Sequence, residues 1–423
     1  MIEQPLTLPC GATLPNRLAK AAMSEGLADV DGLPTLRHER LYRRWAEGGS
    51  GLLITGNVMI DARSLERPGN VIVEDERAMK PLTAWANAAR SCGRHAIVQL
   101  SHPGRQVQRT INSEPVAPSA VQAVQVMKSF ARPRALTGAE IRDLQRRFVD
   151  AAVLCRRSGF SGVQLHAAHG YLLNQFLSPL TNLRTDEWGG ALENRARLLL
   201  DTVAAVREAT GPSFLISVKL NSADFQRGGF AEDDSLAVVA MLEKAGIDLL
   251  EISGGNYEAP EMFRLGQPDP RRASTVAREA YFLAFAERVR TVAKLPLMVT
   301  GGFRSRAAME AALTAGQLDV VGLARPLALE PDFAQRLLDG TTERSPVTPK
   351  RFFLRQLDML ADGAWSWHQI RRIADGKQPD PALSTWRAVL AFVLQDLTLA
   401  ARRRRQPLLA APAPPTSTDP GQS

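Results

Sequence analysis

Short apolar runs alternate along the chain with longer stretches whose apolar positions recur at helical spacing. Strands that are apolar on both faces and joined by helices are typical of a parallel sheet. The pattern predicts strands at 18–23, 51–58, 95–100, 162–166, 214–220, 248–253, 297–300 and 320–323. It predicts helices at 36–47, 77–91, 138–158, 192–210, 233–245, 278–292, 306–315 and 331–338.

Eight strand–helix units within roughly 320 residues predict an α/β fold of the (β/α)8 TIM-barrel type. A doubly wound sheet is the alternative, but it requires a G-x-G-x-x-G turn after its first strand, and none follows 18–23. Helix ends support the assignment. Thr137 and Glu140 have the spacing of a capping box, and Gly159, Gly246 and Gly316 stand where helices should stop.

The pattern divides the chain into a barrel at 1–340, a helical C-terminal extension at 341–409 and a disordered tail at 410–423 that is rich in Pro, Ala, Ser and Thr. Two connections, 101–136 and 167–191, are too long for plain βα loops. Both follow strands, so we expect both at the C-terminal face, where barrel enzymes build their active sites.

Composition and charge exclude several classes of protein. Apolar residues make up 45% of the 423 and charged residues 23%, as in globular proteins. Of the net charge of +8, residues 344–423 supply +6, with twelve basic and six acidic side chains. We therefore expect no nucleic-acid partner, because the barrel itself is nearly neutral. Cysteines 10, 92 and 155 form no C-x-x-C pair and the N-terminus has no apolar signal region, which together predict a cytoplasmic protein without structural zinc.

Candidate chemistry begins at the end of the fourth predicted strand. His166 and His169 can donate two N–H groups to one substrate oxygen, and Tyr171 can deliver a proton nearby. Ordinary loop packing is the alternative. A zinc pair is less well supported, because no cysteine or acidic ligand stands close by.

The ends of the last two predicted strands indicate a phosphate site. Gly301 and Gly302 allow a close approach of the backbone, and Arg325 can bind phosphate oxygens with its two-pronged guanidinium. Glycine turns beside a surface arginine are the alternative. Gln99 and Lys219 stand at other strand ends, where a backbone hydrogen bond and an internal salt bridge compete with ligand binding.

The sequence over roughly residues 1–340 resembles the Old Yellow Enzyme family of NAD(P)H:flavin oxidoreductases. The resemblance rests on Leu14-Pro-Asn-Arg-Leu18, Ala22-Met23-Ser24, His102-Pro-Gly-Arg-Gln106, Glu193-Asn-Arg195, the glycine and Ala-Arg-Pro turns and, above all, the run from His166 to Arg195. It implies bound FMN, with NADH or NADPH as the hydride donor.

The resemblance also implies roles for individual residues. Ala22, Met23 and Ser24 would line the flavin near N5 and O4, with Gly56 close to the ring. Gln99 would pair with the pyrimidine edge, and Lys219 would lie beside N1 and O2. Gly301, Gly302, Phe303, Ala324 and Arg325 would hold the phosphate. His166 and His169 would bind the substrate oxygen, and Tyr171 would donate the proton.

The chain departs from the family pattern at several positions. Ala22 and Ala324 stand where many members have Pro and Gly, Lys219 replaces a frequent Arg, and Ser24 replaces Thr or Cys. The implied activity is reduction of an activated alkene, an α,β-unsaturated carbonyl or nitro compound. An NADH oxidase, an amine dehydrogenase or demethylase, and a non-catalytic flavin-binding scaffold are the alternatives.

The C-terminal stretch 383–401 is apolar for a surface helix and runs into Arg402–Arg405. Arg387 and Asp396 make it a poor membrane-spanning helix, because each costs about 2.5–3.5 kcal/mol near the bilayer centre. We expect the helix to pack against the barrel or a second subunit in a homo-oligomer. Weak contact with a membrane surface is the alternative.

Overall fold

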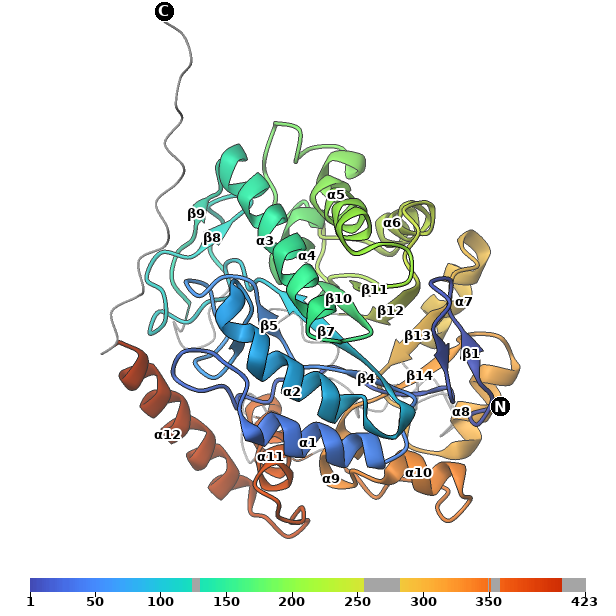
Figure 1. Ribbon diagram of the computed structural model, residues 1–423. Coiled ribbons are helices and arrows are strands. Elements are labelled where there is room, and N and C mark those ends of the chain that lie inside the picture. The colour runs from blue at the N-terminus through green and yellow to red at the C-terminus, as the bar shows by residue number, and fades with distance from the viewer. Residues whose placement is uncertain (124–129, 255–281, 349, 351–357, 405–423) are drawn as a thin grey trace, which may run out of the picture.

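The computed structural model describes residues 1–123, 130–254, 282–348, 350 and 358–404, and within them parallel strands close into a barrel (Figure 1). The barrel strands are β3 (Leu18–Lys20), β4 (Leu52–Ile54), β7 (His95–Ser101), β10 (Gly162–Ala167), β11 (Leu215–Asn221), β12 (Leu249–Ser253), β13 (Leu297–Thr300) and β14 (Val320–Leu323). The sheet runs β10-β11-β12-β13-β14-β3-β4-β7, and β7 pairs back onto β10. The predicted (β/α)8 barrel is confirmed.

A β-hairpin closes the end of the barrel that lies opposite the C-terminal ends of its strands. Strands β1 (Leu6–Thr7) and β2 (Thr13–Leu14) pair antiparallel and place Leu8 and Leu14 against inward-facing residues of the barrel strands, such as Ile97 and Met298. Because these side chains fill the inside, the barrel is a packed core with its working surface at the opposite, C-terminal face.

Helices cover the outside of the barrel and bury a second, larger apolar layer against it. They are α1 (Leu36–Glu47), α2 (Met79–Ala89), α3 (Gly138–Arg157), α4 (Leu172–Leu177), α5 (Leu192–Thr210), α6 (Glu232–Lys244), α7 (Leu283–Val292), α8 (Arg306–Thr314), α9 (Arg325–Leu329) and α10 (Phe333–Leu338). The predicted capping box forms at the start of α3, where Thr137 accepts from the backbone N–H of Glu140 and the Glu140 carboxylate accepts from that of Thr137.

Short additional elements lie around the barrel. Strands β5 (Val58–Met59) and β6 (Val71–Ile72) extend the sheet from β7. A separate parallel pair, β8 (Val116–Ala117) and β9 (Arg134–Ala135), lies in the long connection after β7. Two 3-10 turns, η1 (Glu76–Ala78) and η2 (Ser91–Gly93), flank α2.

The differences from the predicted elements occur near the mouth of the barrel. The strand predicted at 18–23 ends at Lys20. The strand predicted at 51–58 is interrupted at Gly56, where a Cβ atom would lie 2.2 Å from the Glu25 carboxylate. Of the helix predicted at 278–292, residues 278–281 lie outside the described residues, and the described part is helical from Leu283. The predicted tail at 410–423 also lies outside the described residues.

After residue 340 the described chain forms α11 (Asp358–Ala374) and α12 (Thr385–Arg404). Helix α11 contacts α1, α9 and α12, and α12 lies at the periphery (Figure 1). None of the helices in the described part of the chain combines the length and apolar character that crossing a bilayer requires. The predicted domain boundaries at 340 and 409 stay predictions.

A buried arginine attaches α12 to the barrel. The Arg67 guanidinium lies 4.2 Å from the ring centre of Phe392 and 5.5 Å from that of Trp367, and it donates to the Asp396 carboxylate at 2.9 Å. The Arg67 side chain is only 8% exposed, so solvent cannot replace the carboxylate. The predicted packing of this helix on the barrel therefore holds for one of its faces.

Replacing Asp396 with Ala should destabilise the protein by about 1.5–3 kcal/mol, because Arg67 keeps its charge and loses its charged hydrogen-bond acceptor. Urea unfolding followed by circular dichroism measures the change. The matched control is Glu187→Ala, which removes an ion-pair partner that is 54% exposed and should leave the midpoint unchanged. Equal effects of the two substitutions would contradict the account.

Candidate active site

The strand register brings the polar strand-end residues together at one side of the barrel mouth. Lys219 of β11 lies directly between His166 of β10 and Glu251 of β12. All three side chains are buried. In a parallel barrel such neighbours share the C-terminal face, so the side chains that the sequence singles out on separate strands form one site.

The two histidines are linked in a chain of hydrogen bonds. His166 Nδ1 is 2.9 Å from Asn57 Oδ1, His166 Nε2 is 3.1 Å from His169 Nδ1, and His169 Nε2 is 2.8 Å from Ser253 Oγ. An amide oxygen only accepts, so His166 carries its proton on Nδ1. His166 Nε2 then accepts from His169, which accepts from the Ser253 hydroxyl.

Both imidazoles are neutral. Burial in the barrel mouth lowers the pKa of His166 and of His169 well below the ordinary value, and the positive charge of Lys219 lowers each further. Each ring therefore offers a single N–H. The sequence-based expectation that both donate to one oxygen requires the proton of His166 to move from Nδ1, where Asn57 holds it, to Nε2.

His169 sits in an uncommon backbone conformation. Its φ is 62°, in the left-handed region that non-glycine residues rarely adopt, and Gly170 follows with φ 76°. The Asn221 side chain accepts from the backbone N–H of His169 at 3.1 Å and holds the turn. Such conformations cost of order 1–3 kcal/mol and are found at functional sites, where the surrounding structure maintains them.

Tyr171 lies beside His166, with ring centres 4.7 Å apart, and is 3% exposed. The Asn57 amide donates to the Tyr171 hydroxyl at 3.5 Å. Asn57 thus contacts both the histidine and the tyrosine that the sequence singled out. Glu66 accepts from Asn57 at 3.5 Å and fixes which way its amide points.

Lys219 is paired inside the barrel. Its Nζ donates to Glu251 Oε1 at 2.8 Å, and Gln164 donates to Glu251 Oε2 at 2.8 Å. Gln99 in turn donates to Gln164 at 2.7 Å. The internal salt bridge considered for Lys219 is therefore present, while Gln99 bonds a side chain of the next strand rather than backbone. The buried Glu251 carboxylate therefore holds the cation, and the two linked amides orient that carboxylate.

A second network of buried hydrogen bonds, made by Lys20 and Glu25, supports the segment 22–24. Glu25, the next residue, accepts from the backbone N–H of Gly56 at 3.0 Å and from the hydroxyl of Tyr42. Fully buried Lys20 donates to the Ile54 carbonyl at 2.7 Å, and burial lowers its pKa to about 8. Ser24 itself donates to Glu66 at 3.2 Å, so Glu66 connects this segment to Asn57.

The ends of β13 and β14 form the second half of the mouth. Gly301 and Gly302 have φ of 122° and 88°, which frees their backbone to face a ligand, and the Phe303 side chain is buried beside them. Among the residues that the structure describes, the buried Thr300 hydroxyl has no hydrogen-bond partner. Ala324 precedes α9, and Arg325 donates to Asp362 of α11 at 2.8 Å.

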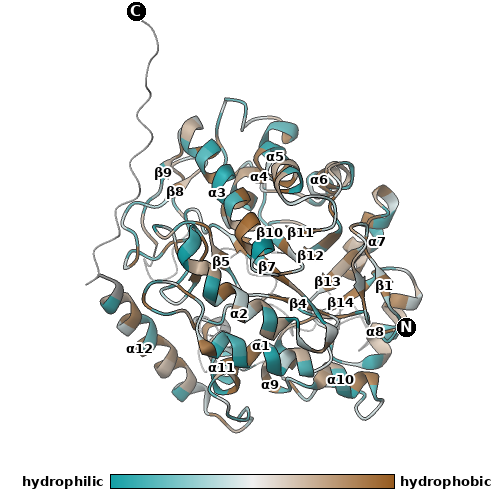
Figure 2. Ribbon diagram, in the orientation of Figure 1, coloured by the Kyte–Doolittle hydropathy of each residue, from teal (hydrophilic) through white to brown (hydrophobic). Residues whose placement is uncertain are grey.

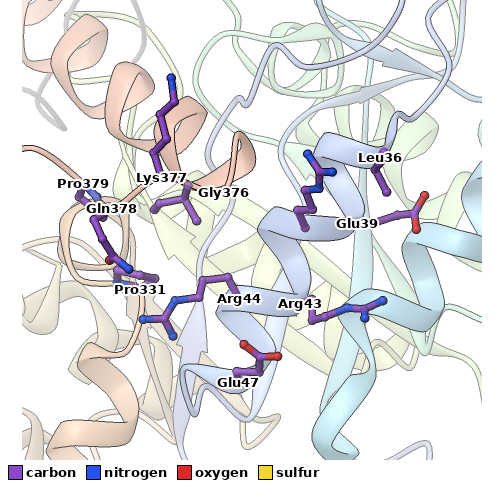
Figure 3. A pocket seen from close by; sticks show the side chains of 12 residues that line it. Leu36, Glu39, Arg43, Arg44, Glu47, Pro331, Gly376, Lys377, Gln378 and Pro379 are labelled. Atoms are coloured by element: carbon purple, nitrogen blue, oxygen red, sulfur yellow. The ribbon is translucent and has the colours of Figure 1, made fainter.

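One further groove, of about 410 Å³, lies on the outer side of α1 (Figure 3). Arg43, Arg44 and Glu47 of α1 line one side, and Lys377 and Gln378, after α11, line the other. Half of its lining residues are charged, and they lie on the far side of α1 from the barrel strands. The groove is therefore separate from the site.

No group of three or more His, Cys, Asp or Glu in the described ranges is placed to hold a metal ion.

Sequence reasoning missed the residues that support the site, namely Asn57, Glu251, Glu25 and Asp362. One signal was available for Glu251, because an acidic residue inside the apolar run 249–253 must find a buried partner. Asn57 offered a similar signal, because it is a polar residue inside the apolar run predicted as a strand at 51–58, whereas Asp362 gave none. The roles predicted for the individual site residues stay predictions.

Comparison with known proteins places this geometry in a family. Residues 2–343 match the model of the NADH:flavin oxidoreductase / NADH oxidase family. The chain is 39% identical over 387 residues to the NADH-dependent flavin oxidoreductase iliE of Hypocrea jecorina (strain QM6a), covering 84% of this chain and 95% of that protein. The protein therefore belongs to this flavin-dependent family of oxidoreductases.

Solved structures give the same result. The Old Yellow Enzyme homologue from Zymomonas mobilis superimposes with a TM-score of 0.70 at 28% identity, over 82% of this chain and 94% of that one. Morphinone reductase superimposes with a TM-score of 0.67 at 26% identity, over 82% and 91%. The resemblance to Old Yellow Enzymes is confirmed, and with it FMN and NAD(P)H as the cofactors of the family.

The residues present fit FMN. The unpartnered Thr300 hydroxyl and the two left-handed glycines offer donors to a phosphate beside Arg325. Lys219 and Gln99 offer a cation and an amide on the strands across the barrel. A molecule with a dianionic phosphate at one end and a ring of hydrogen-bonding carbonyls at the other matches this donor set.

Replacing Glu251 with Gln should make the reduction potential of bound FMN more positive. The substitution keeps a hydrogen-bonding group for Gln164 but leaves Lys219 as an uncompensated cation, which favours the more negatively charged reduced flavin. Each tenfold gain in preference for reduced over oxidised flavin corresponds to about 30 mV.

Dye-coupled redox titration measures the potential of the Glu251→Gln protein. Asp362→Asn is the matched control, since it removes the carboxylate that pairs with Arg325 and should leave the potential unchanged. A potential for Glu251→Gln that is unchanged or more negative would show that this carboxylate does not set the charge of Lys219.

His102 should make stability depend on pH. Burial lowers its pKa to about 4, and its Nδ1 accepts from the backbone N–H of Gly104 at 3.1 Å. Between pH 6.5 and about 4 the unfolded chain binds a proton that the folded protein does not. The free energy of unfolding should therefore fall with falling pH across this window, by up to about 1.4 kcal/mol per pH unit.

His102→Asn keeps an acceptor for Gly104 and removes the proton uptake, so its urea-unfolding free energy should depend less steeply on pH. The comparison is made at pH 7, 6 and 5, where most of the protein remains folded. Identical slopes for the two proteins would refute the assignment.

Proposed function

We propose that the protein reduces the double bond of an activated alkene, an α,β-unsaturated carbonyl or nitro compound, with electrons from NAD(P)H. The observation that supports this most strongly is the hydrogen-bonded pair of neutral imidazoles, buried His166 and half-buried His169, next to Lys219. Neutral N–H donors polarise a carbonyl or nitro oxygen without giving up a proton, which suits an acceptor that gains negative charge in the reaction.

When bound, FMN would supply the hydride chemistry that links the nicotinamide to the β-carbon of the alkene. The chain positions its partners. Lys219 and Gln99 would hold the flavin ring edge, and Ala22, Met23, Ser24 and Gly56 would line the ring. Gly301, Gly302, Phe303, Ala324 and Arg325 hold the phosphate.

The substrate oxygen would accept from His169 Nδ1 in place of His166 Nε2, the group that accepts that N–H in this structure. His166 would be the second donor after its proton moves from Nδ1 to Nε2. Ser101 Oγ lies 3.4 Å from His166 Nδ1 and can donate to that nitrogen after the exchange. Tyr171, whose hydroxyl lies beside Asn57, would deliver the proton to the α-carbon.

A second candidate is an NADH oxidase that passes electrons to O2, because the family description includes that activity. The same site would then use its flavin without the two histidines, since O2 has no carbonyl or nitro oxygen to polarise.

The proposed function includes a cytoplasmic location, because the three cysteines are scattered along the sequence.

His166→Ala and His169→Ala should each slow alkene reduction on the order of 10²-fold, the typical cost of one lost donor to a developing oxyanion. Reduction of the flavin by NAD(P)H should change much less. Anaerobic stopped-flow absorbance separates the two half-reactions, with cyclohexenone, a nitroalkene and O2 as alternative acceptors.

The O2 arm is the internal control, because its rate should not respond to the histidine substitutions. If the variants lose both half-reactions equally, the assignment of the histidines fails. If the unmodified protein reacts with O2 far faster than with either alkene, the oxidase activity is correct instead.

A further inference from the structure

Helix α12 presents a row of large apolar side chains to solvent. Trp386, Leu390, Val393, Leu394 and Leu397 are 40–60% exposed, and they are five of the eleven large apolar side chains found exposed in the described ranges. Their spacing of four, three, one and three residues puts them on one face of the helix. We call these five residues the α12 stripe. Figure 2 shows apolar segments along this helix although it lies at the edge of the molecule.

The stripe is turned outward by contacts on the opposite face. Ala388 is fully buried, the Phe392 ring packs edge-on against Trp367 with centres 5.2 Å apart, and Asp396 accepts from Arg67. These contacts fix the rotation of the helix about its axis. The stripe cannot turn inward without breaking the buried ion pair, so it is a permanent surface of this fold.

The charge around the stripe is positive. Arg387 and Arg402 are exposed, and the sequence continues with three further arginines at 403–405. The segment 385–405 contains a single acidic residue, Asp396, which is already engaged by Arg67. Exposed Arg387 and Arg402 therefore flank the stripe, and the sequence from 385 to 405 adds three more basic residues and no further acidic one.

This charge argues against a second copy of the chain as the occupant. An antiparallel pairing of two α12 helices centred on Leu394 would bring Arg402 of each copy next to Trp386 and Arg387 of the other. A parallel pairing would align the arginine runs. Either arrangement packs like charges together with no acidic residue of α12 to compensate, which is unfavourable in any interface.

We propose that the α12 stripe binds the surface of an anionic lipid bilayer. The stripe spans eleven residue steps, roughly 17 Å, so the helix would lie flat with its apolar side chains in the boundary between head groups and acyl chains. Trp386 suits that boundary, because its ring is apolar and its N–H is polar. Arg387 and Arg402 would contact the lipid phosphates.

Flotation with lipid vesicles tests the proposal on the full-length holoenzyme. We expect binding to vesicles of phosphatidylserine and phosphatidylcholine to be at least tenfold stronger than to phosphatidylcholine alone, and to weaken as salt is added. The variant Leu390→Glu/Leu394→Glu should lose at least tenfold in binding. Replacing Arg402–Arg405 with Ser should remove the preference for anionic vesicles.

The matched control is Val292→Glu, which places a charge at a 39% exposed apolar position on α7 and should leave binding unchanged. Circular dichroism checks that every variant is folded. No binding, equal binding to both vesicle types, or an equal loss in the control would overturn the proposal. So would a dimer in light scattering that Leu390→Glu/Leu394→Glu converts to monomer, because the stripe would then be a subunit interface.

Discussion

The ion pair between Lys219 and Glu251 is the interaction on which the site depends. Both side chains lie inside the barrel, 5% and 0% exposed, where an unpaired charge would be prohibitively costly. Adjacent strands in register place them 2.8 Å apart. Glu251 also binds Gln164, and Gln164 binds Gln99, so the carboxylate on β12 orders polar side chains on three other strands, β11, β10 and β7.

The same cation shapes the chemistry of the histidines. Lys219 lies beside His166 in the strand register and, together with burial, keeps both imidazoles neutral. Neutral rings form a directional chain in which each nitrogen has one role, from the Ser253 hydroxyl to the Asn57 amide. The barrel thus supplies fixed dipoles at its mouth rather than mobile charges, which is what stabilisation of a developing oxyanion requires.

The C-terminal extension also supports the site. Asp362 of α11 accepts from Arg325, beside the glycine turn, and α12 holds Arg67 through Asp396. Arg67 adjoins Glu66, which in turn binds Ser24 and Asn57. The extension is therefore connected to both halves of the mouth, through Arg325 and through Arg67, although it lies outside the barrel.

Much of this could be predicted from sequence. The period of the apolar pattern predicted the barrel, and the histidines, the glycine turns and Lys219 stood out because polar or unusual residues close apolar strands. Their partners could not be predicted. Pairing of Glu251 with Lys219 depends on strand register, and the tautomer of His166 depends on Asn57, which lies 109 residues away in the chain. Contact with Arg67 determines which face of α12 is exposed. Because Arg67 lies far from α12 in the chain, the apolar pattern of the helix alone does not predict that face.

Binding of FMN tests the central claim most directly. We predict that the purified protein shows the visible absorption bands of a flavin, and that protein stripped of its flavin binds added FMN with one molecule per chain. Protein that shows no flavin absorption even after incubation with FMN would contradict the account, because the strand-end cations and donors would then have no ligand.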